Sequence, residues 1–328
     1  MVHLVVRIGI RRGILSVFKY LAMPGRAAPL VGFLPDRSLW RMGVGIILEQ
    51  CILQAMIIDG RAVAQTVLQN TAAIVKALPA APVLTVFTCA PTFETQKFLA
   101  LKRQKAEQIG ITVRVVEFSV EATVPEIVMS IQAAHRTSSG IIVQLPFPPQ
   151  VDIEEVLPAI LPSHDVDVLT YDGSTTTVLP PVAGAIAAIC QQENIPVHGA
   201  NVLVIGQGRL VGVPVSIYMR QQGARVTVVT KDSTDDMTAL ARTADIIVSG
   251  AGVPGLVTAA MVSPGTVVFD AGTSEDNGTL VGDVDPFVAE KCHMFTPVPG
   301  GIGPITVAIL LQNVARLAQA QIEKTSHL

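Results

Sequence analysis

The stretch Asn201–Pro214, NVLVIGQGRLVGVP, decides the fold of this chain. A short apolar run is followed by three glycines, Gly206, Gly208 and Gly212, at the point where a helical pattern begins. Glycines placed there allow a tight turn and a close approach of the backbone to a pyrophosphate, whose charge is stabilised at the helix N-terminus. The spacing GxGxxxG is one residue longer than the usual fingerprint, so a glycine turn without a ligand is the alternative. The order of strand, loop and helix favours a nicotinamide nucleotide.

The end of the next predicted strand bears on the choice between NADP and NAD. That strand, Arg225–Thr230, is followed by Lys231 and Asp232. Lys231 can pair with a 2′-phosphate, whereas Asp232 can accept hydrogen bonds from ribose hydroxyls. Arg209 in the glycine loop is a second candidate for a phosphate contact, and a solvated turn is an equally good interpretation of Lys231. We therefore expect NADP, with NAD as the alternative cofactor.

Helical and strand patterns alternate on both sides of the glycine loop. Such alternation predicts parallel strands joined by crossover helices, and therefore an α/β fold class with two α/β domains. The second domain is expected to be a Rossmann-like dinucleotide-binding domain with a parallel sheet. The predicted strands are Pro82–Phe87, Thr112–Phe118, Gly140–Leu145, Val202–Ile205, Arg225–Thr230, Asp245–Val248 and Val267–Phe269. The predicted helices are Gly60–Leu78, Thr95–Ile109, Val124–Ala134, Glu154–Ile160, Ala183–Gln192, Val213–Gln222, Met237–Ala241 and Pro304–Ile322.

The first 55 residues differ from the rest, with a net charge of +5 against −8 for the remainder of the chain. Basic residues interrupt each apolar stretch up to Met42, so no clean signal peptide is present. The apolar run Met42–Ile58 contains Glu49 and is short for a membrane span. An organelle-type presequence, a disordered leader and a misplaced start are the three interpretations. We favour a true start at Met56, where the ordered pattern begins.

Composition excludes several other functions. Half of the 328 residues are hydrophobic, 15% are charged and the net charge is −3, which argues against nucleic acid as a partner. The histidines show no metal-binding spacing, so no metal site is expected. The cysteines form no CxxC pair and are expected to be buried thiols in a reducing compartment. They are Cys51, Cys89, Cys190 and Cys292.

Four further segments carry candidate chemistry. Phe98 and Lys102 share a helix face, where a desolvated lysine can act as an acid or base, although a surface lysine is the commoner case. Gln144 ends a predicted strand at the edge where open sheets bind ligands. Asp167 lies in a loop with a second acid, which is more often a solvated or capping arrangement. The segment Thr296–Thr306, TPVPGGIGPIT, indicates a loop of fixed shape, with a domain linker as the alternative.

Taken together, these segments resemble the bifunctional methylenetetrahydrofolate dehydrogenase/cyclohydrolase family from about Met56 to the C-terminus. Several motifs in the same order carry the resemblance. They are IIDGRAVAQ (Ile57–Gln65), GIIVQLPFP (Gly140–Pro148), PSHDVD (Pro162–Asp167), VGDVD (Val281–Asp285) and TPVPGGIGPIT. The resemblance implies a folate and catalytic domain at 56–176, with the C-terminal helix at 304–325 packing back on it, and an NADP-binding domain at 177–303. It also implies a homodimer in the cytoplasm, with tetrahydrofolate derivatives as substrates.

The resemblance further implies the roles of single residues. Lys102, Gln144 and Asp167 would be the catalytic residues of an enzyme that oxidises methylenetetrahydrofolate with NADP and hydrolyses the methenyl product to formyltetrahydrofolate. A neutral Lys102 held by Gln144 tolerates the cationic methenyl compound, and Asp167 can accept paired N–H donors from the pterin. The expected substrate-binding residues are Phe98, Gln144, Asp167, Pro299, Gly300 and Gly301. The expected cofactor-binding residues are Gly206, Gln207, Gly208, Arg209, Lys231 and Thr273.

The sequence departs from the family pattern at several positions. Phe98 replaces a tyrosine, Val168 replaces a glycine and Gln207 replaces an arginine that some members use near the 2′-phosphate. The usual PCTPxG segment reads LPPVAG at Leu179–Gly184. These changes bear on hydrolysis and on the choice of NADP or NAD. A monofunctional dehydrogenase and a silent folate- or nucleotide-binding homologue are therefore the alternatives.

Overall fold

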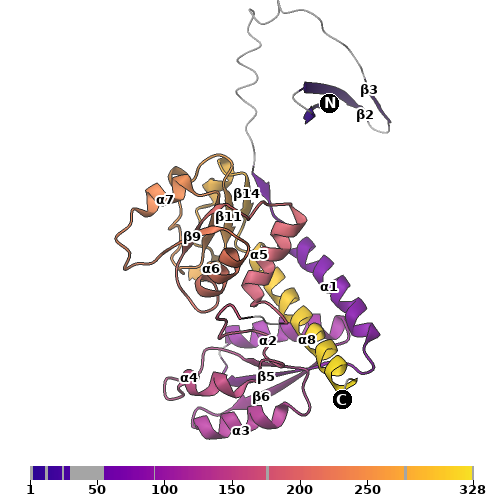
Figure 1. Ribbon diagram of the computed structural model, residues 1–328, viewed down its shortest axis with the longest axis vertical. Helices are drawn as coiled ribbons and strands as arrows, with labels where there is room; N and C mark the ends of the chain where they lie inside the picture. Colours follow the sequence, from indigo (N-terminus) through magenta and orange to yellow (C-terminus); the bar gives the residue numbers. More distant parts are fainter. Residues whose placement is uncertain are drawn as a thin grey trace, which may run out of the picture. The chain divides into compact units, whose positions relative to one another are not determined.

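The computed structural model describes residues 3–11, 14–23, 26–29, 55–91, 93–174, 177–276 and 279–326. The chain divides into two compact units, residues 1–52 and 53–328. The described part of the first unit is an antiparallel sheet of β1 (His3–Arg11), β2 (Ile14–Met23) and β3 (Arg26–Pro29), in that order (Figure 1). The expectation of a leader or a misplaced start for residues 1–55 stays a prediction.

A three-stranded parallel sheet forms one part of the second unit, with the order β6-β5-β7. Its central strand is buried along nearly all of its length because both faces are covered. Leu84 and Val86 share a core with Ala106 of the second helix, whereas Phe87 packs in a separate core with Ile127 of the third. The elements are α1 (Gly60–Ala77), β5 (Val83–Cys89), α2 (Phe93–Gln108), β6 (Thr112–Phe118), α3 (Val124–Ala134), β7 (Gly140–Val143), α4 (Ile153–Val156) and η3 (Leu157–Ala159).

A six-stranded sheet has the order β4-β14-β11-β10-β8-β9, and all of its pairs are parallel. The predicted α/β class with a Rossmann-like parallel sheet is therefore confirmed. The strands are β4 (Met56–Ile57), β8 (Asn201–Ile205), β9 (Arg225–Val229), β10 (Ile246–Ser249), β11 (Val267–Asp270) and β14 (Met294–Thr296). The other elements are α5 (Pro181–Gln192), α6 (Gly212–Gln221), α7 (Met237–Thr243), η4 (Ala259–Met261), β12 (Ser274–Asp276), β13 (Thr279–Val281) and η5 (Pro286–Glu290).

The chain reverses its direction of travel across this sheet at β8. From β8 it moves outward to β9, and it then returns to β10 on the other side of β8. In open α/β sheets the crevice at such a switch point, outside the carboxyl ends of the strands, is where ligands bind. The loops that follow β8 and β10 therefore flank the expected nucleotide site.

The last helix, α8 (Ile302–Ser326), lies alongside α1 (Figure 1) and contacts α5, α2 and β7. Pro304 lies in its first turn, where a missing N–H costs nothing. The buried Asn313 donates from Nδ2 to the carbonyls of Val166 (2.9 Å) and Leu179 (2.8 Å). This helix thus fixes the loop that contains Asp167. Among the described residues, no helix is long and apolar enough to cross a membrane.

Candidate active site

Lys102 and Gln144 meet above the carboxyl edge of the three-stranded sheet. Lys102 extends from α2, and its Nζ donates to Oε1 of Gln144 at 2.7 Å. Gln144 follows β7, and its backbone N–H donates to the carbonyl of Phe87 at 2.8 Å, which continues the parallel ladder. The amide of Gln144 also donates to the carbonyl of Leu145 at 3.1 Å. Gln144 is therefore held at both its backbone and its side chain, and it fixes the lysine amine.

Burial favours the neutral forms of Lys102 and of the nearby Asp167. It lowers the pKa of the Lys102 amine, and the charge of Asp167 opposes that shift only in part. Burial likewise raises the pKa of Asp167, against the opposing effect of Lys102. An amine with a lowered pKa is a base that is available closer to neutral pH than an ordinary lysine.

The loop that carries Asp167 is shaped by Asp165. The Oδ1 atom of Asp165 accepts from the backbone N–H groups of Asp167 (3.2 Å) and Val168 (2.8 Å). Burial raises the pKa of Asp165 to about 6. Val168 adopts a φ of 49°, the left-handed region that glycine adopts without strain. The sequence interpretation noticed two acids here but not this turn, which the Asp-x-Asp spacing could have indicated.

A cavity joins these residues to the rest of the site. Side chains from five parts of the fold line it: α2, the loop that contains Asp167, the start of α5, the glycine loop, and the N-terminal half of α8. The lining residues are Lys102, Asp167, Leu169, Pro180, Pro181, Val182, Arg209, Leu210, Thr306, Val307 and Leu310. Two predicted catalytic residues and one predicted cofactor residue therefore face one space.

The predicted substrate residues Pro299, Gly300 and Gly301 belong to a segment that packs on the start of α1. The carbonyl of Gly300 accepts from the N–H of Gly60 at 2.9 Å. A Cβ on Gly60 would lie 1.7 Å from the carbonyl oxygen of Gly301, so the segment packs closely on the start of α1. Their contact with substrate stays a prediction. Phe98 lies on α2 one turn before Lys102, and its side chain lies outside the described residues.

The glycine loop is built for the close approach of a ligand to its backbone. Gly206 has a φ of +95°, and a Cβ on Gly212 would lie 2.0 Å from the carbonyl oxygen of Gly206. A Cβ on Gly208 would meet open space. The loop leads directly into α6, whose ten residues supply a helix N-terminus. The open backbone beside a helix start fits a pyrophosphate.

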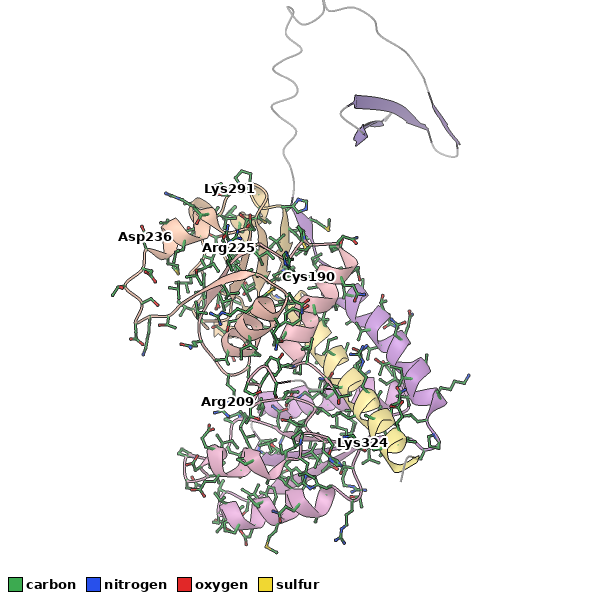
Figure 2. All side chains as sticks on the ribbon, viewed as in Figure 1. Cys190, Arg209, Arg225, Asp236, Lys291 and Lys324 are labelled. Atoms are coloured by element: carbon green, nitrogen blue, oxygen red, sulfur yellow. The ribbon has the colours of Figure 1, made fainter. Side chains whose placement is uncertain are left out.

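The remaining predicted cofactor residues lie on neighbouring loops. Lys231 follows β9 and Thr273 follows β11, and both are exposed at the carboxyl edge of the sheet. Gln207 and Arg209 line a second cavity with Tyr171. Arg209, labelled in Figure 2, is not free, because it forms an ion pair with Glu154 at the start of α4. The sequence interpretation did not foresee this partner of Arg209.

A switch-point crevice with a glycine loop, next to a half-buried lysine–glutamine pair, defines a nicotinamide-nucleotide-dependent enzyme of the α/β class with two parallel sheets. The catalytic-domain model of the tetrahydrofolate dehydrogenase/cyclohydrolase family matches residues 58–167, and the NAD(P)-binding-domain model of that family matches residues 180–322. The chain belongs to this family, and the predicted resemblance is confirmed.

Individual relatives agree with this assignment. The chain is 35% identical to the bifunctional protein FolD of Exiguobacterium sibiricum over 277 residues, which cover 81% of this chain and 100% of the relative. Its structure is similar to that of the bifunctional FolD enzyme of Campylobacter jejuni, with a TM-score of 0.77, 28% identity and coverage of 81% and 99%. The Trypanosoma brucei enzyme, complexed with NADP and an inhibitor, has a TM-score of 0.75, 30% identity and coverage of 82% and 98%.

Proposed function

We propose that this chain is a bifunctional enzyme that oxidises methylenetetrahydrofolate to the methenyl form with NADP and then hydrolyses that product to formyltetrahydrofolate. The observation that carries the proposal is the hydrogen bond of 2.7 Å between Lys102 and Gln144, beside a cavity that Asp167 and the glycine loop also line. Membership of the family and the named activities of its relatives support it.

In this proposal each catalytic side chain has one task. Asp167 binds the pterin by accepting its paired N–H donors. Lys102 is neutral, so it does not repel the cationic methenyl carbon, and Gln144 holds its amine towards the substrate. When water adds to that carbon, Lys102 accepts one proton of the water and returns it to the ring nitrogen, whose bond to that carbon breaks as the ring opens. The second proton of the water leaves to solvent as the formyl carbonyl forms.

The glycine loop would hold NADP, which supplies a hydride acceptor when it is bound. Gln207 and Gly208 would contact the pyrophosphate through their backbone N–H groups, together with the start of α6. The N–H of Gly206 donates to the carbonyl of Val229 at 2.8 Å, so Gly206 would serve the nucleotide through the tight turn that it allows. Arg209, Lys231 and Thr273 would contact the remainder of the nucleotide. Their places at the carboxyl edge of the six-stranded sheet support these roles.

One assay tests the proposed function. Purified full chain is mixed with methylenetetrahydrofolate and either NADP or NAD, and the methenyl absorbance is followed. We expect a rise with NADP, and then a decay faster than in buffer. A stable methenyl product would leave a monofunctional dehydrogenase, and no turnover with either nucleotide would contradict both the bifunctional enzyme and the monofunctional dehydrogenase.

Three broader expectations belong to the same proposal. The domain boundaries at residues 176/177 and 303/304, a homodimer and a cytoplasmic location all follow from the family resemblance. The free buried thiols of Cys89, Cys190 and Cys292 fit a reducing compartment. Light scattering should give a mass twice the 34.6 kDa of one chain. Cell fractionation should recover the protein with the cytoplasm, and a single-chain mass or a membrane fraction would contradict these expectations.

A further inference from the structure

Two buried carboxylates lie at the carboxyl edge of the six-stranded sheet, outside the proposed mechanism. Asp270 ends β11, and Asp283 follows β13; their exposed fractions are 1% and 0%. Among the described residues, neither forms an ion pair with a lysine or arginine. A buried carboxylate without a counter-ion needs several hydrogen-bond donors to offset its loss of hydration. Those donors show what each carboxylate holds in place.

The carboxylate of Asp283 accepts hydrogen bonds from the segment that follows β10. Its Oδ2 atom accepts from Ser249 Oγ (2.8 Å), from the N–H of Ala251 (2.7 Å) and from the N–H of Gly252 (3.3 Å). Its Oδ1 atom accepts from the N–H of Val253 at 2.9 Å. Three backbone N–H groups and one hydroxyl therefore converge on one carboxylate, and they fix the path of residues 249–253.

The segment that Asp283 holds is the neighbour of the glycine loop. A Cβ on Gly206 would lie 2.7 Å from the carbonyl oxygen of Gly250. A Cβ on Gly250 would lie 2.4 Å from the side chain of Val211, at the other end of the glycine loop. Because β8 and β10 are adjacent at the switch point, these two loops are the two walls of the nucleotide crevice. A shift of one wall would change the width of the crevice.

Asp270 in turn holds Asp283. Its Oδ1 atom accepts from the N–H groups of Gly272 (2.9 Å) and Asp283 (3.1 Å), and its Oδ2 atom accepts from the N–H of Val284 (3.0 Å). Glycine is required beside both carboxylates: a Cβ on Gly282 would lie 1.9 Å from Asp270, and one on Gly272 would lie 2.3 Å from Asp283. The two acids thus connect the end of β11 to the loop after β10.

We infer that Asp283 is a positioning residue for the dinucleotide: its carboxylate holds residues 249–253 as the second wall of the crevice that the glycine loop begins. This inference rests on the proposed function. It assigns Asp283 to NADP binding and therefore to the dehydrogenase step. Hydrolysis of the methenyl compound needs no nucleotide, so it should be independent of this carboxylate.

The test compares the wild type with Asp283→Asn and with a matched control, Asp285→Asn. Asp285 lies in the same VGDVD segment, but its carboxylate caps η5 by accepting from the N–H of Phe287 at 2.9 Å. The side-chain amide that Asp283→Asn introduces would turn a donor towards backbone donors and release part of the wall. The Kd of NADP is measured by calorimetry without substrate, and hydrolysis of methenyltetrahydrofolate is measured without nucleotide.

We expect Asp283→Asn to weaken NADP binding about tenfold, with hydrolysis within about twofold of wild type. Amide hydrogen exchange at Ala251 and Val253 should accelerate in the same variant. Asp285→Asn should leave the Kd of NADP within about twofold. An unchanged Kd in folded Asp283→Asn would overturn the inference, as would a loss of hydrolysis equal to the loss of NADP affinity.

Ser249→Ala decides the question if Asp283→Asn fails to fold. It removes one donor and leaves the carboxylate in place, so we expect about threefold weaker NADP binding and unchanged hydrolysis. Wild-type NADP affinity in Ser249→Ala would then overturn the inference. A wild-type protein that neither binds NADP nor hydrolyses the methenyl compound would instead contradict the proposed function itself, which keeps the two failures distinct.

Discussion

At the scale of single residues, the environment of Lys102 decides what the site can do. The spacing of Phe98 and Lys102 alone favoured a surface lysine; the family resemblance implied that Gln144 holds Lys102, and the structure contains that hydrogen bond. The resemblance also implied a neutral amine, but the spacing alone could not predict the lowered pKa, since it depends on burial created by distant segments. Asp283 was missed for the same reason, because its donors come from residues 30 to 34 positions away.

Replacement of the lysine tests its role directly. Lys102→Met keeps an unbranched side chain but removes the amine, so hydrolysis should fall at least about 100-fold, and most dehydrogenase activity should be lost. In the wild type, hydrolysis should rise with pH as the amine, whose pKa is lowered by burial, loses its proton. Lys105→Met, on the same helix, is the control and should retain near-normal rates. Wild-type hydrolysis by Lys102→Met would refute the assignment.

Asp165 offers a prediction about stability and pH. Burial raises its pKa from 3.8 to about 6, so the folded state binds the proton more tightly than the unfolded state does. The wild type therefore loses stability through this group as pH rises from about 4 to about 6. Asp165→Asn keeps an Oδ1 acceptor and cannot ionise. Its stability relative to wild type should rise by roughly 1–3 kcal/mol across that window.

Urea unfolding of both proteins at several pH values between 4 and 7 measures this difference. Asp270, whose pKa burial also raises to about 6, is present in both proteins, so its contribution cancels in the comparison. Parallel stability curves for the two proteins would show that the burial of Asp165 does not govern its protonation.

At the scale of elements, the longer and periodic segments were predictable and the short ones were not. Each predicted strand has its counterpart, but β4 and β14 contain only two and three residues and show no alternation in the sequence. Their pairing depends on β11, which offers an edge far away in the chain. Helix ends differ by a few residues, as for α8, predicted as Pro304–Ile322 and found as Ile302–Ser326.

The start of α1 provides a test at this scale. Gly60→Ala would place a Cβ 1.7 Å from the carbonyl oxygen of Gly301, so helix and segment must separate. We expect a loss of about 1–3 kcal/mol in the free energy of unfolding. If Gly300 and Gly301 contact substrate as predicted, the KM for methylenetetrahydrofolate should rise as well.

Gly303→Ala is the matched control for that variant. A Cβ on Gly303 meets nothing within 4 Å, and the residue lies in the first turn of α8. Alanine restricts the unfolded chain, so we expect a gain of roughly 0.5 kcal/mol. Equal melting temperatures for wild type and Gly60→Ala would show that the close approach of the backbones at Gly60 and Gly301 does not contribute to stability.

At the scale of the 53–328 unit, the parts of the fold around its two parallel sheets are joined by contacts between residues far apart in sequence. Asn313 of α8 reaches Val166 across 147 residues, and Arg209 reaches Glu154 across 55. No local pattern encodes such pairs, which is why the sequence indicated Arg209 as a phosphate ligand without its acidic partner. The ion pair and the predicted phosphate contact compete for the same guanidinium group.

Two variants separate these roles of Arg209. Glu154→Gln frees the guanidinium, so the preference for NADP over NAD should rise about threefold, as expected for loss of an exposed ion pair. Arg209→Ala should lower that preference, because only NADP carries the 2′-phosphate. Glu155→Gln, the adjacent acid on α4, is the control and should change the preference little. Calorimetric Kd values for both nucleotides measure the effect. If Arg209 only joins the parts of the fold that carry the two parallel sheets, Glu154→Gln and Arg209→Ala should instead shift the preference for NADP over NAD in the same direction. Added salt should then abolish the difference in this preference between the wild type and each of the two variants.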